Sequence, residues 1–195
     1  MKKFLLFVLL LPLLLFTGCT TETPKEDDKE VDTPNVETKI AVVYFSATNN
    51  TARVASKIAE QLDVALIEIT PKVAYTSEDL NYNNNNCRAN IEQNDALARP
   101  EILNEIDLSS YDTIFLGYPI WWGKLPKIIY TFCDAHDLTG YTLVPFCTSG
   151  GSSISTSAQE LKELEPNANH LTGKRLSSNV SDTEISNWLD SLNVK

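Results

Sequence analysis

Four short apolar runs recur along the chain from residue 40 onward, and each is predicted to form a β-strand. They span residues 40–45, 64–69, 113–118 and 143–147. Each run is apolar along nearly its whole length, which is typical of strands covered on both faces of a sheet. A fifth strand is expected over residues 174–176, the only candidate at that point of the chain, although this segment is short and polar.

Amphipathic segments separate the runs, with apolar residues at three- and four-residue steps. They predict helices around residues 52–62 and over residues 124–136, 157–164 and 182–192. Pro126 suits the first turn of the second helix, and Ser181 with Glu184 forms a capping box at the start of the last one. Strands that alternate with helices predict an α/β fold with a doubly wound parallel sheet.

The segment 70–110, between the second and third predicted strands, is too long for a simple connection. Four consecutive asparagines at 83–86 are typical of disorder, but Tyr75, Leu80 and Tyr82 nearby offer side chains that can pack. Loops of this length in compact domains are usually either functional or disordered. We expect an ordered flap that covers part of a binding site.

The first 19 residues have the layout of an export signal. Lys2 and Lys3 precede an apolar run over residues 4–16, which is shorter than a membrane span requires. The end of this segment resembles a bacterial lipoprotein signal, in which Cys19 is lipidated and becomes the new N-terminus. An ordinary secretory signal and an uncleaved anchor are the alternatives.

Residues 20–37 carry hardly any apolar side chain and are rich in Thr, Glu, Pro, Lys and Asp. Such a segment cannot bury a core, so it is predicted to be a flexible acidic linker. One globular domain of ordinary size is expected over residues 38–195. Together these segments predict a secreted protein that is held outside the cytoplasm, on a membrane, through its N-terminal lipid alone.

The formal net charge of the chain is −10, and removal of residues 1–18, which carry two lysines and no acidic residue, would leave −12. This charge argues against a nucleic-acid partner, because phosphate binding needs clustered basic residues. It suits a basic protein partner or repulsion from anionic lipid head groups. Beyond Cys19 there are three cysteines without paired spacing, which argues against a disulfide framework or a zinc site.

A short polar turn, residues 46–51, joins the first strand to the first helix. The free N–H groups and the dipole of the first helical turn favour an anion at this place. Ser46, Thr48 and Thr51 add hydroxyl donors. Because the turn holds neither Lys nor Arg, a phosphate would be held there by dipoles and hydrogen bonds, unlike in a Walker loop.

Two further loops leave the carboxyl ends of predicted strands, where ligands bind in open parallel sheets. Residues 118–123 set Trp121 and Trp122 side by side in a turn, which a flat ring stacked on one indole would explain. Packing in a core or a subunit interface is the alternative. Residues 148–153 include Gly150 and Gly151, which let the backbone approach a ligand closely.

Three segments in this order resemble a subset of the flavodoxin-like FMN-binding proteins: Tyr-Phe-Ser-Ala-Thr at 44–48, Pro-Ile-Trp-Trp-Gly at 119–123 and Thr-Ser-Gly-Gly-Ser at 148–152. The resemblance implies a flavodoxin-like, five-stranded parallel sheet in the order 2-1-3-4-5, with helices on both faces. It implies FMN as the cofactor, with its phosphate in the first loop and its isoalloxazine between the other two. The implied cofactor-binding residues are Ser46, Ala47, Thr48, Asn49, Asn50, Thr51, Pro119, Ile120, Trp121, Trp122, Gly123, Thr148, Ser149, Gly150, Gly151 and Ser152.

The chain departs from this family at Asn49, where glycine is usual. Glycine would serve a left-handed or tight backbone at this position, and asparagine tolerates that conformation best after glycine. Phosphate binding is therefore expected to persist.

The resulting hypothesis is an FMN-dependent redox protein. It leaves open a one-electron carrier that docks with a protein, and a reductase that takes hydride from a nicotinamide and passes electrons to a quinone or another small acceptor. A flavin-free scaffold or binding lipoprotein is the rival from a different class.

No catalytic side chain is predicted, because the sequence shows no acid–base pair, nucleophile motif or metal-ligand cluster. Cys147 is expected to be a buried structural thiol and Cys87 an inert exposed thiol. His136 and His170 are expected at the surface, because neither has a partner by spacing.

Overall fold

The computed structural model describes residues 39–194, and their strands form one parallel sheet. The strands are β1 (Ile40–Tyr44), β2 (Ala65–Glu68), β3 (Thr113–Pro119), β4 (Thr142–Thr148), β5 (Asn169–His170) and β6 (Lys174–Leu176). Their order is β2-β1-β3-β4-β5, with β6 also paired to β4. In the register, Val42 of β1 lies between Leu66 of β2 and Phe115 of β3. The predicted flavodoxin-like fold and strand order are confirmed.

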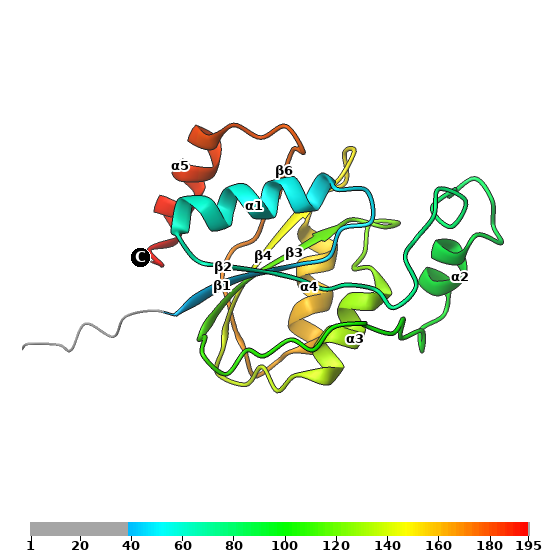
Figure 1. Ribbon diagram of the computed structural model, residues 1–195, viewed down its shortest axis with the longest axis horizontal. Helices are drawn as coiled ribbons and strands as arrows, with labels where there is room; N and C mark the ends of the chain where they lie inside the picture. The colour runs from blue at the N-terminus through cyan, green and yellow to red at the C-terminus, as the bar shows by residue number, and fades with distance from the viewer. Residues whose placement is uncertain (1–38, 195) are drawn as a thin grey trace, which may run out of the picture. The chain divides into compact units, whose positions relative to one another are not determined.

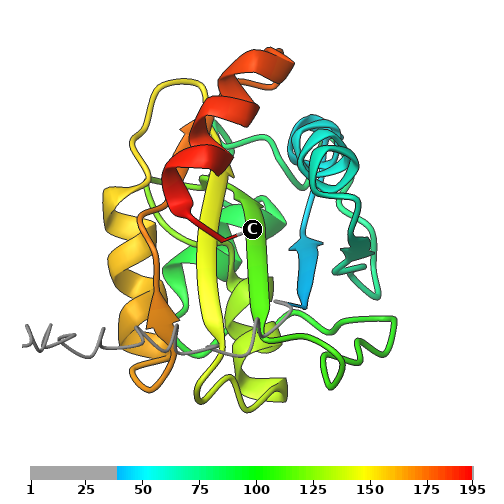
Figure 2. The same ribbon diagram turned by 90° about the vertical axis from the view of Figure 1, so that its left-hand side faces the viewer.

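Helices cover both faces of this sheet (Figures 1 and 2). Helices α1 (Asn50–Leu62) and α5 (Asp182–Leu192) lie on one face, and α3 (Lys127–Ala135) and α4 (Ser155–Leu164) lie on the other. The remaining helix, α2 (Arg88–Asn94), lies beyond the end of the sheet in the long β2–β3 connection. None of the helices in residues 39–194 has the length and apolar character needed to cross a membrane.

Helix starts differ from the sequence-based expectation in three places, and the first helix begins at Asn50, inside the turn predicted over residues 46–51. The helix expected from residue 124 begins at Lys127, because Pro126 is its N-cap in an extended conformation (φ −60°, ψ 142°) and does not belong to the first turn. The helix expected from residue 157 begins earlier, at Ser155. The last helix begins at residue 182 as predicted, and the Ser181 hydroxyl accepts a hydrogen bond from the Glu184 N–H at 3.2 Å.

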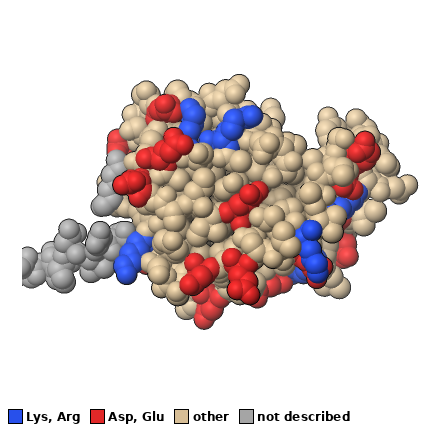
Figure 3. All heavy atoms as spheres, in the orientation of Figure 1, with Lys and Arg blue, Asp and Glu red and all other residues tan. Residues whose placement is uncertain are grey.

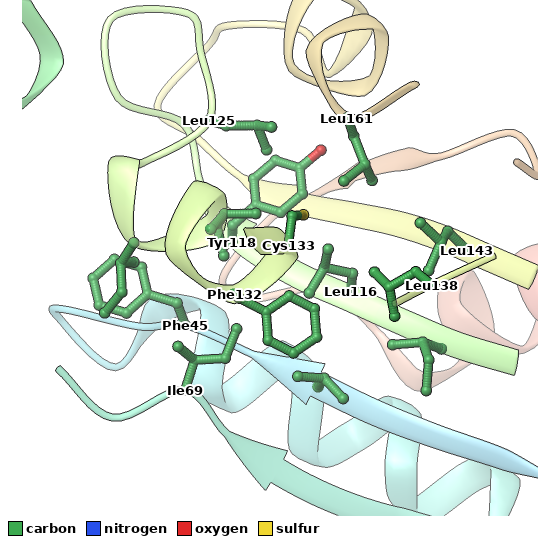
Figure 4. Packing of buried hydrophobic residues seen from close by; sticks show 14 of the residues in the cluster. Phe45, Ile69, Leu116, Tyr118, Leu125, Phe132, Cys133, Leu138, Leu143 and Leu161 are labelled. Atoms are coloured by element: carbon green, nitrogen blue, oxygen red, sulfur yellow. The ribbon is translucent and has the colours of Figure 1, made fainter. Parts of the chain in front are cut away.

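Two apolar cores result, one on each face of the sheet. On the α1–α5 face, Val42, Phe115 and Phe146 pack with Ile58 and Trp188. Figure 4 shows the other core, where residues of β1, β3 and β4 meet α3 and α4. Burial on both sides explains why β1, β3 and β4 are apolar runs, whereas the edge strand β2 alternates between half-buried and exposed residues.

The fifth position of the sheet is filled by two short strands, where one was expected. The N–H groups of Asn169 and Leu171 donate to the carbonyl oxygens of Tyr141, just before β4, and of Leu143 in β4. The next residue of β4 facing this neighbour is Pro145, which has no N–H to donate. The pairing breaks there, and Gly173 packs so closely on Pro145 that a Cβ at residue 173 would lie 2.6 Å from the Pro145 carbonyl oxygen.

The predicted signal peptide, the lipidation site Cys19 and the acidic linker lie outside the described residues.

Candidate functional site

The loops that follow β1, β3 and β4 meet at one end of the sheet, which is also the end nearest α2 (Figure 1). They enclose a cavity of about 290 Å³, which we call the three-loop cavity. Nine residues line it: Thr48, Asn50, Pro119, Ile120, Trp121, Thr148, Ser149, Gly150 and Ser178. The structure therefore brings together the three loops that the sequence singled out.

The first loop, residues 46–49, turns the chain from β1 into α1. Asn49 is the N-cap of α1 and adopts a left-handed backbone (φ 61°, ψ 1°), the conformation anticipated for this position. Its carbonyl oxygen accepts the first helical hydrogen bond, from the Arg53 N–H at 3.1 Å. The N–H groups before Arg53 have no carbonyl partner within the helix, so they remain available to an anion.

Ser46 stands at the base of this loop. Its hydroxyl oxygen is buried and has no hydrogen-bond partner among the described residues. Burying a hydroxyl without a partner costs free energy, so such groups are rare in folded proteins. An acceptor placed in the loop would satisfy this hydroxyl.

The side chains of Thr51 and Thr148 join the first loop to the third. Both residues are buried, and their hydroxyl oxygens lie 2.9 Å apart. A backbone hydrogen bond links the second loop to the third, because the Ile120 N–H donates to the Thr148 carbonyl oxygen at 2.9 Å. Each hydroxyl retains further hydrogen-bonding capacity, so Thr51 can still serve a ligand while it fixes the loop spacing.

The two tryptophans of the second loop have different environments. Trp121 packs edge-on against Phe45 and Tyr75, with ring centroids 5.6 and 5.1 Å away. Trp122 has a left-handed backbone (φ 50°) and an exposed fraction of 47%. Trp121 thus has core-like neighbours and also lines the three-loop cavity, whereas Trp122 has a large exposed ring.

The third loop leaves open space for a ligand. A Cβ added at Gly150 or Gly151 would meet no atom within 4 Å. The loop is held in shape by a hydrogen bond from the Ser149 hydroxyl to the Ser152 carbonyl oxygen.

Within the flap expected over residues 70–110, the segment 75–94 is ordered by a network around α2. The Arg88 guanidinium lies 3.9 Å from the centre of the Tyr75 ring and forms an ion pair with Glu92. The Tyr75 hydroxyl donates to Glu92 at 2.6 Å, and burial together with this carboxylate raises the pKa of Tyr75. The Gln93 amide donates to the carbonyl oxygens of Trp121 and Leu125, both at 3.1 Å. The expected ordered flap is thus present and holds the second loop.

Comparisons with known proteins agree with this geometry. The sequence model of a flavodoxin family matches residues 39–192. The chain belongs to the flavodoxin family. A search of curated proteins found no significant match.

Several solved structures are similar to this flavodoxin-family chain. A candidate flavoprotein from Bacteroides eggerthii shares 46% identity over 80% of this chain and 99% of its own, with a TM-score of 0.77. A second candidate flavoprotein, from Bacteroides uniformis, shares 40% identity over 78% of this chain and 98% of its own, with a TM-score of 0.76. A flavoprotein from Lactobacillus acidophilus, described in complex with FMN, shares 25% identity over 78% and 99%, with a TM-score of 0.61.

Not all the residues singled out in the sequence reach the three-loop cavity. Eight of them are absent from its lining: Ser46, Ala47, Asn49, Thr51, Trp122, Gly123, Gly151 and Ser152. Among these, Ala47 and Trp122 line a neighbouring cavity on the flap side.

Sequence reasoning missed Ser178, which lines the three-loop cavity, and Arg175, whose guanidinium lies 3.5 Å from the Ser149 carbonyl oxygen. Both could have been found from the short candidate strand at 174–176, since a fifth parallel strand must end at the same edge of the sheet. It also missed Arg53, which lies one turn into α1 and donates to the Asn50 side chain, so a cation stands beside the lysine-free loop.

The expectations for three surface residues were wrong. Cys87 is buried, with 4% of its surface exposed, and is the N-cap of α2 in the flap. His136 and His170 are partly buried and tie loops together. The ring nitrogens of His136 lie 2.7 Å from the Phe132 carbonyl oxygen and 3.0 Å from that of Ile106, and His170 lies 2.8 Å from the Glu165 carbonyl oxygen.

Cys147 is a buried thiol, as expected, and burial raises its pKa to about 12. Cys133 lies in the same core, beside the Tyr118 ring (Figure 4), and burial also raises the pKa of its thiol. The three cysteines of the described residues are free. A thiol with a raised pKa is a poor nucleophile, so the structure supports a packing role for both of these cysteines.

Proposed function

We propose that this protein is an FMN-binding redox protein. The observation that carries the proposal is the buried hydroxyl of Ser46, which has no partner among the described residues and belongs to the loop that leads from β1 into the N-terminus of α1. A phosphate in this turn would accept from that hydroxyl and from the free N–H groups. The FMN described in the Lactobacillus acidophilus flavoprotein supports the choice of ligand.

The residues of the three loops fit the parts of FMN. The phosphate would be held by residues 46–51, with Arg53 as a nearby cation. The isoalloxazine would lie between residues 119–123 and 148–152, where Gly150 and Gly151 leave room for a ring. The bound flavin would supply the chemistry, the transfer of one or two electrons, and the protein would set its access and potential.

The location proposed for this redox protein is outside the cytoplasm, on a membrane. Its support is the lipoprotein-like start of the sequence, with Cys19 as the lipidated residue, followed by the linker. Mass spectrometry of the mature N-terminus tests this proposal, and an unmodified Cys19 would contradict it.

A titration with FMN and riboflavin tests the cofactor assignment. We expect the full-length protein to bind FMN tightly, with a shifted flavin absorption spectrum, and to bind riboflavin at least tenfold more weakly because riboflavin lacks the phosphate. Protein that leaves the spectrum of added FMN unchanged would favour the flavin-free scaffold. Equal affinity for both flavins would contradict the assigned phosphate site.

A reductase remains the second candidate beside an electron carrier, because the ordered flap builds an additional cavity next to the three loops. Steady-state assays with NADH or NADPH and a small acceptor separate the two candidates. Turnover without a partner protein supports the reductase. Reduction that requires a second protein supports the carrier, for which the acidic charge of the chain provides a docking surface.

A further inference from the structure

A second cavity, which we call the flap cavity, adjoins the three-loop cavity. It has a volume of about 370 Å³, within the range of small-molecule sites. Leu80, Tyr82 and Ala89 of the flap form one side, and the loop after β3, with Trp121 and Trp122, forms another. The flap cavity and the three-loop cavity share Thr48, Pro119, Ile120 and Trp121.

The flap side of this cavity is a built wall. The Asn90 amide donates to the carbonyl oxygens of Tyr82 and Asn84, at 3.2 and 2.7 Å, and Asn90 itself is buried. The Ala89 N–H donates to the Asp79 carbonyl oxygen at 3.0 Å. These bonds fold the asparagine run back onto α2, so the wall has a defined shape before any ligand arrives.

The chemistry of the lining restricts the ligand. No Lys, Arg, Asp or Glu is among the described residues that line the flap cavity, and its aromatic side chains are Tyr82, Trp121 and Trp122. The lining side chains that carry a hydrogen-bond donor are the hydroxyls of Thr48 and Tyr82 and the indole N–H groups of the two tryptophans. Apolar and aromatic walls with a few hydroxyls favour a flat, uncharged ring that carries acceptor oxygens.

We propose that the flap cavity binds an uncharged quinone-type ring. The absence of a cation in its lining, in a chain of net charge −10, disfavours anionic ligands such as a nicotinamide dinucleotide. Ile120 and Trp121 line both cavities, so they would place such a ring next to the proposed flavin. A redox role for the flap cavity therefore rests on the proposed function. The binding itself can be measured without flavin.

Calorimetric titration of the full-length protein with menadione tests this site. Leu80 is partly exposed, and Leu80→Arg places charge and bulk in the cavity. We expect its dissociation constant for menadione to rise at least tenfold, with FMN affinity within twofold of the unchanged protein. The matched control is Leu97→Arg, at a position 84% exposed and outside the lining, which should leave both affinities unchanged.

Two further measurements sharpen the result. The sulfonated analogue 1,4-naphthoquinone-2-sulfonate should bind at least tenfold more weakly than menadione, and saturating FMN should leave menadione affinity within twofold. If Leu80→Arg does not fold, Tyr82→Ala replaces it, because Tyr82 is 70% exposed, and a severalfold loss of menadione affinity is expected.

Unchanged menadione affinity in the folded cavity variant would overturn the proposal. So would equal binding of the sulfonate, or competition between menadione and FMN, which would mean that the flavin itself fills the flap cavity. A protein that binds menadione as described but not FMN would refute the proposed function and leave the flap site standing.

Discussion

At the scale of single residues, the left-handed backbone of Asn49 predicts which substitutions the first loop tolerates. Its left-handed backbone costs a β-branched residue about 1–2 kcal/mol. Asn49→Val should therefore lower the free energy of unfolding by about that amount and weaken FMN binding, whereas Asn49→Gly should preserve both. Urea denaturation and flavin fluorescence quenching measure the two effects.

The chain offers a matched control at Asn193, which is also exposed and left-handed (φ 52°) but follows α5. Asn193→Val should reduce stability similarly and leave FMN affinity unchanged. If Asn49→Val binds FMN as well as the unchanged protein, the loop conformation does not matter for phosphate binding.

Substitution of Ser46 is predicted to affect the stability of the ligand-free protein and its affinity for FMN in opposite directions. Ser46→Ala removes a buried hydroxyl without a partner, so the ligand-free protein should be as stable as before or slightly more stable. The FMN dissociation constant should rise by about tenfold to a hundredfold, the equivalent of a hydrogen bond to a charged group. Affinity for riboflavin should not change.

A control for this substitution is Ser56→Ala on the exposed side of α1, where the hydroxyl donates to Glu60 at 2.9 Å. It should leave FMN affinity unaltered. Equal losses of FMN and riboflavin affinity in Ser46→Ala would show that the hydroxyl does not serve the phosphate.

At the scale of elements, the split fifth strand predicts a sharp difference between two glycines. A Cβ at Gly173 would meet the Pro145 carbonyl oxygen at 2.6 Å, while one at Gly151 would meet open space. Gly173→Ala should lower the free energy of unfolding by about 1–3 kcal/mol, as overpacking does. Gly151→Ala should be neutral in the ligand-free protein, and chemical denaturation of both variants measures the difference.

The same strand shows where sequence reasoning ends. The apolar runs predicted β1, β3 and β4 because burial on both faces leaves a plain hydrophobic signal, and they also predicted the half-exposed edge strand β2. The strand predicted at 174–176 from its place in the chain is present as β6, although two of its three residues are polar. The strand β5, with the polar residues Asn169 and His170, was not predicted, because neither an apolar pattern nor periodicity marks it. In the sequence, only Pro145, which lacks an N–H, marks the break between β5 and β6. Whether Pro145 faces this side of β4 cannot be known until the strand register is known.

The site shows a related limit. Loop composition and resemblance predicted which loops meet, because strand ends share one edge of the sheet. They could not predict that Trp121 packs on Phe45 and Tyr75 while Trp122 stays exposed. That difference depends on the flap, whose Gln93 bonds to the second loop across 28 residues of sequence.

At the scale of the whole molecule, the buried thiols set the response of stability to alkali. Burial raises the pKa of Cys147 from 9.0 to about 12, so the unfolded chain loses this proton first as the pH rises. Stability should therefore hold below about pH 9 and fall between pH 9 and 12. Burial likewise raises the pKa of Cys133 and Tyr118, which adds to the fall.

Urea midpoints measured from pH 8 to 11 test this dependence. Cys147→Ala should start from lower stability because it leaves a cavity, yet its stability should decline less steeply with pH. The slope is the informative quantity, and parallel curves for the two proteins would show that Cys147 does not titrate with an altered pKa.

The net charge of −10 predicts the direction in which the protein shifts the potential of bound FMN. Figure 3 shows acidic side chains gathered along the lower edge of one face, with fewer basic ones between them. Reduction adds negative charge to the flavin, and surrounding carboxylates oppose it, so the potential should lie below that of free FMN.

Because salt screens exposed charges within about 10 Å at 0.1 M, higher ionic strength should raise the potential of the bound flavin toward the free value. Potentiometric titrations at low and high salt measure both effects, with free FMN as the control. A bound potential that is independent of salt would assign the shift to the apolar walls around the ring and would leave the acidic surface for partner docking.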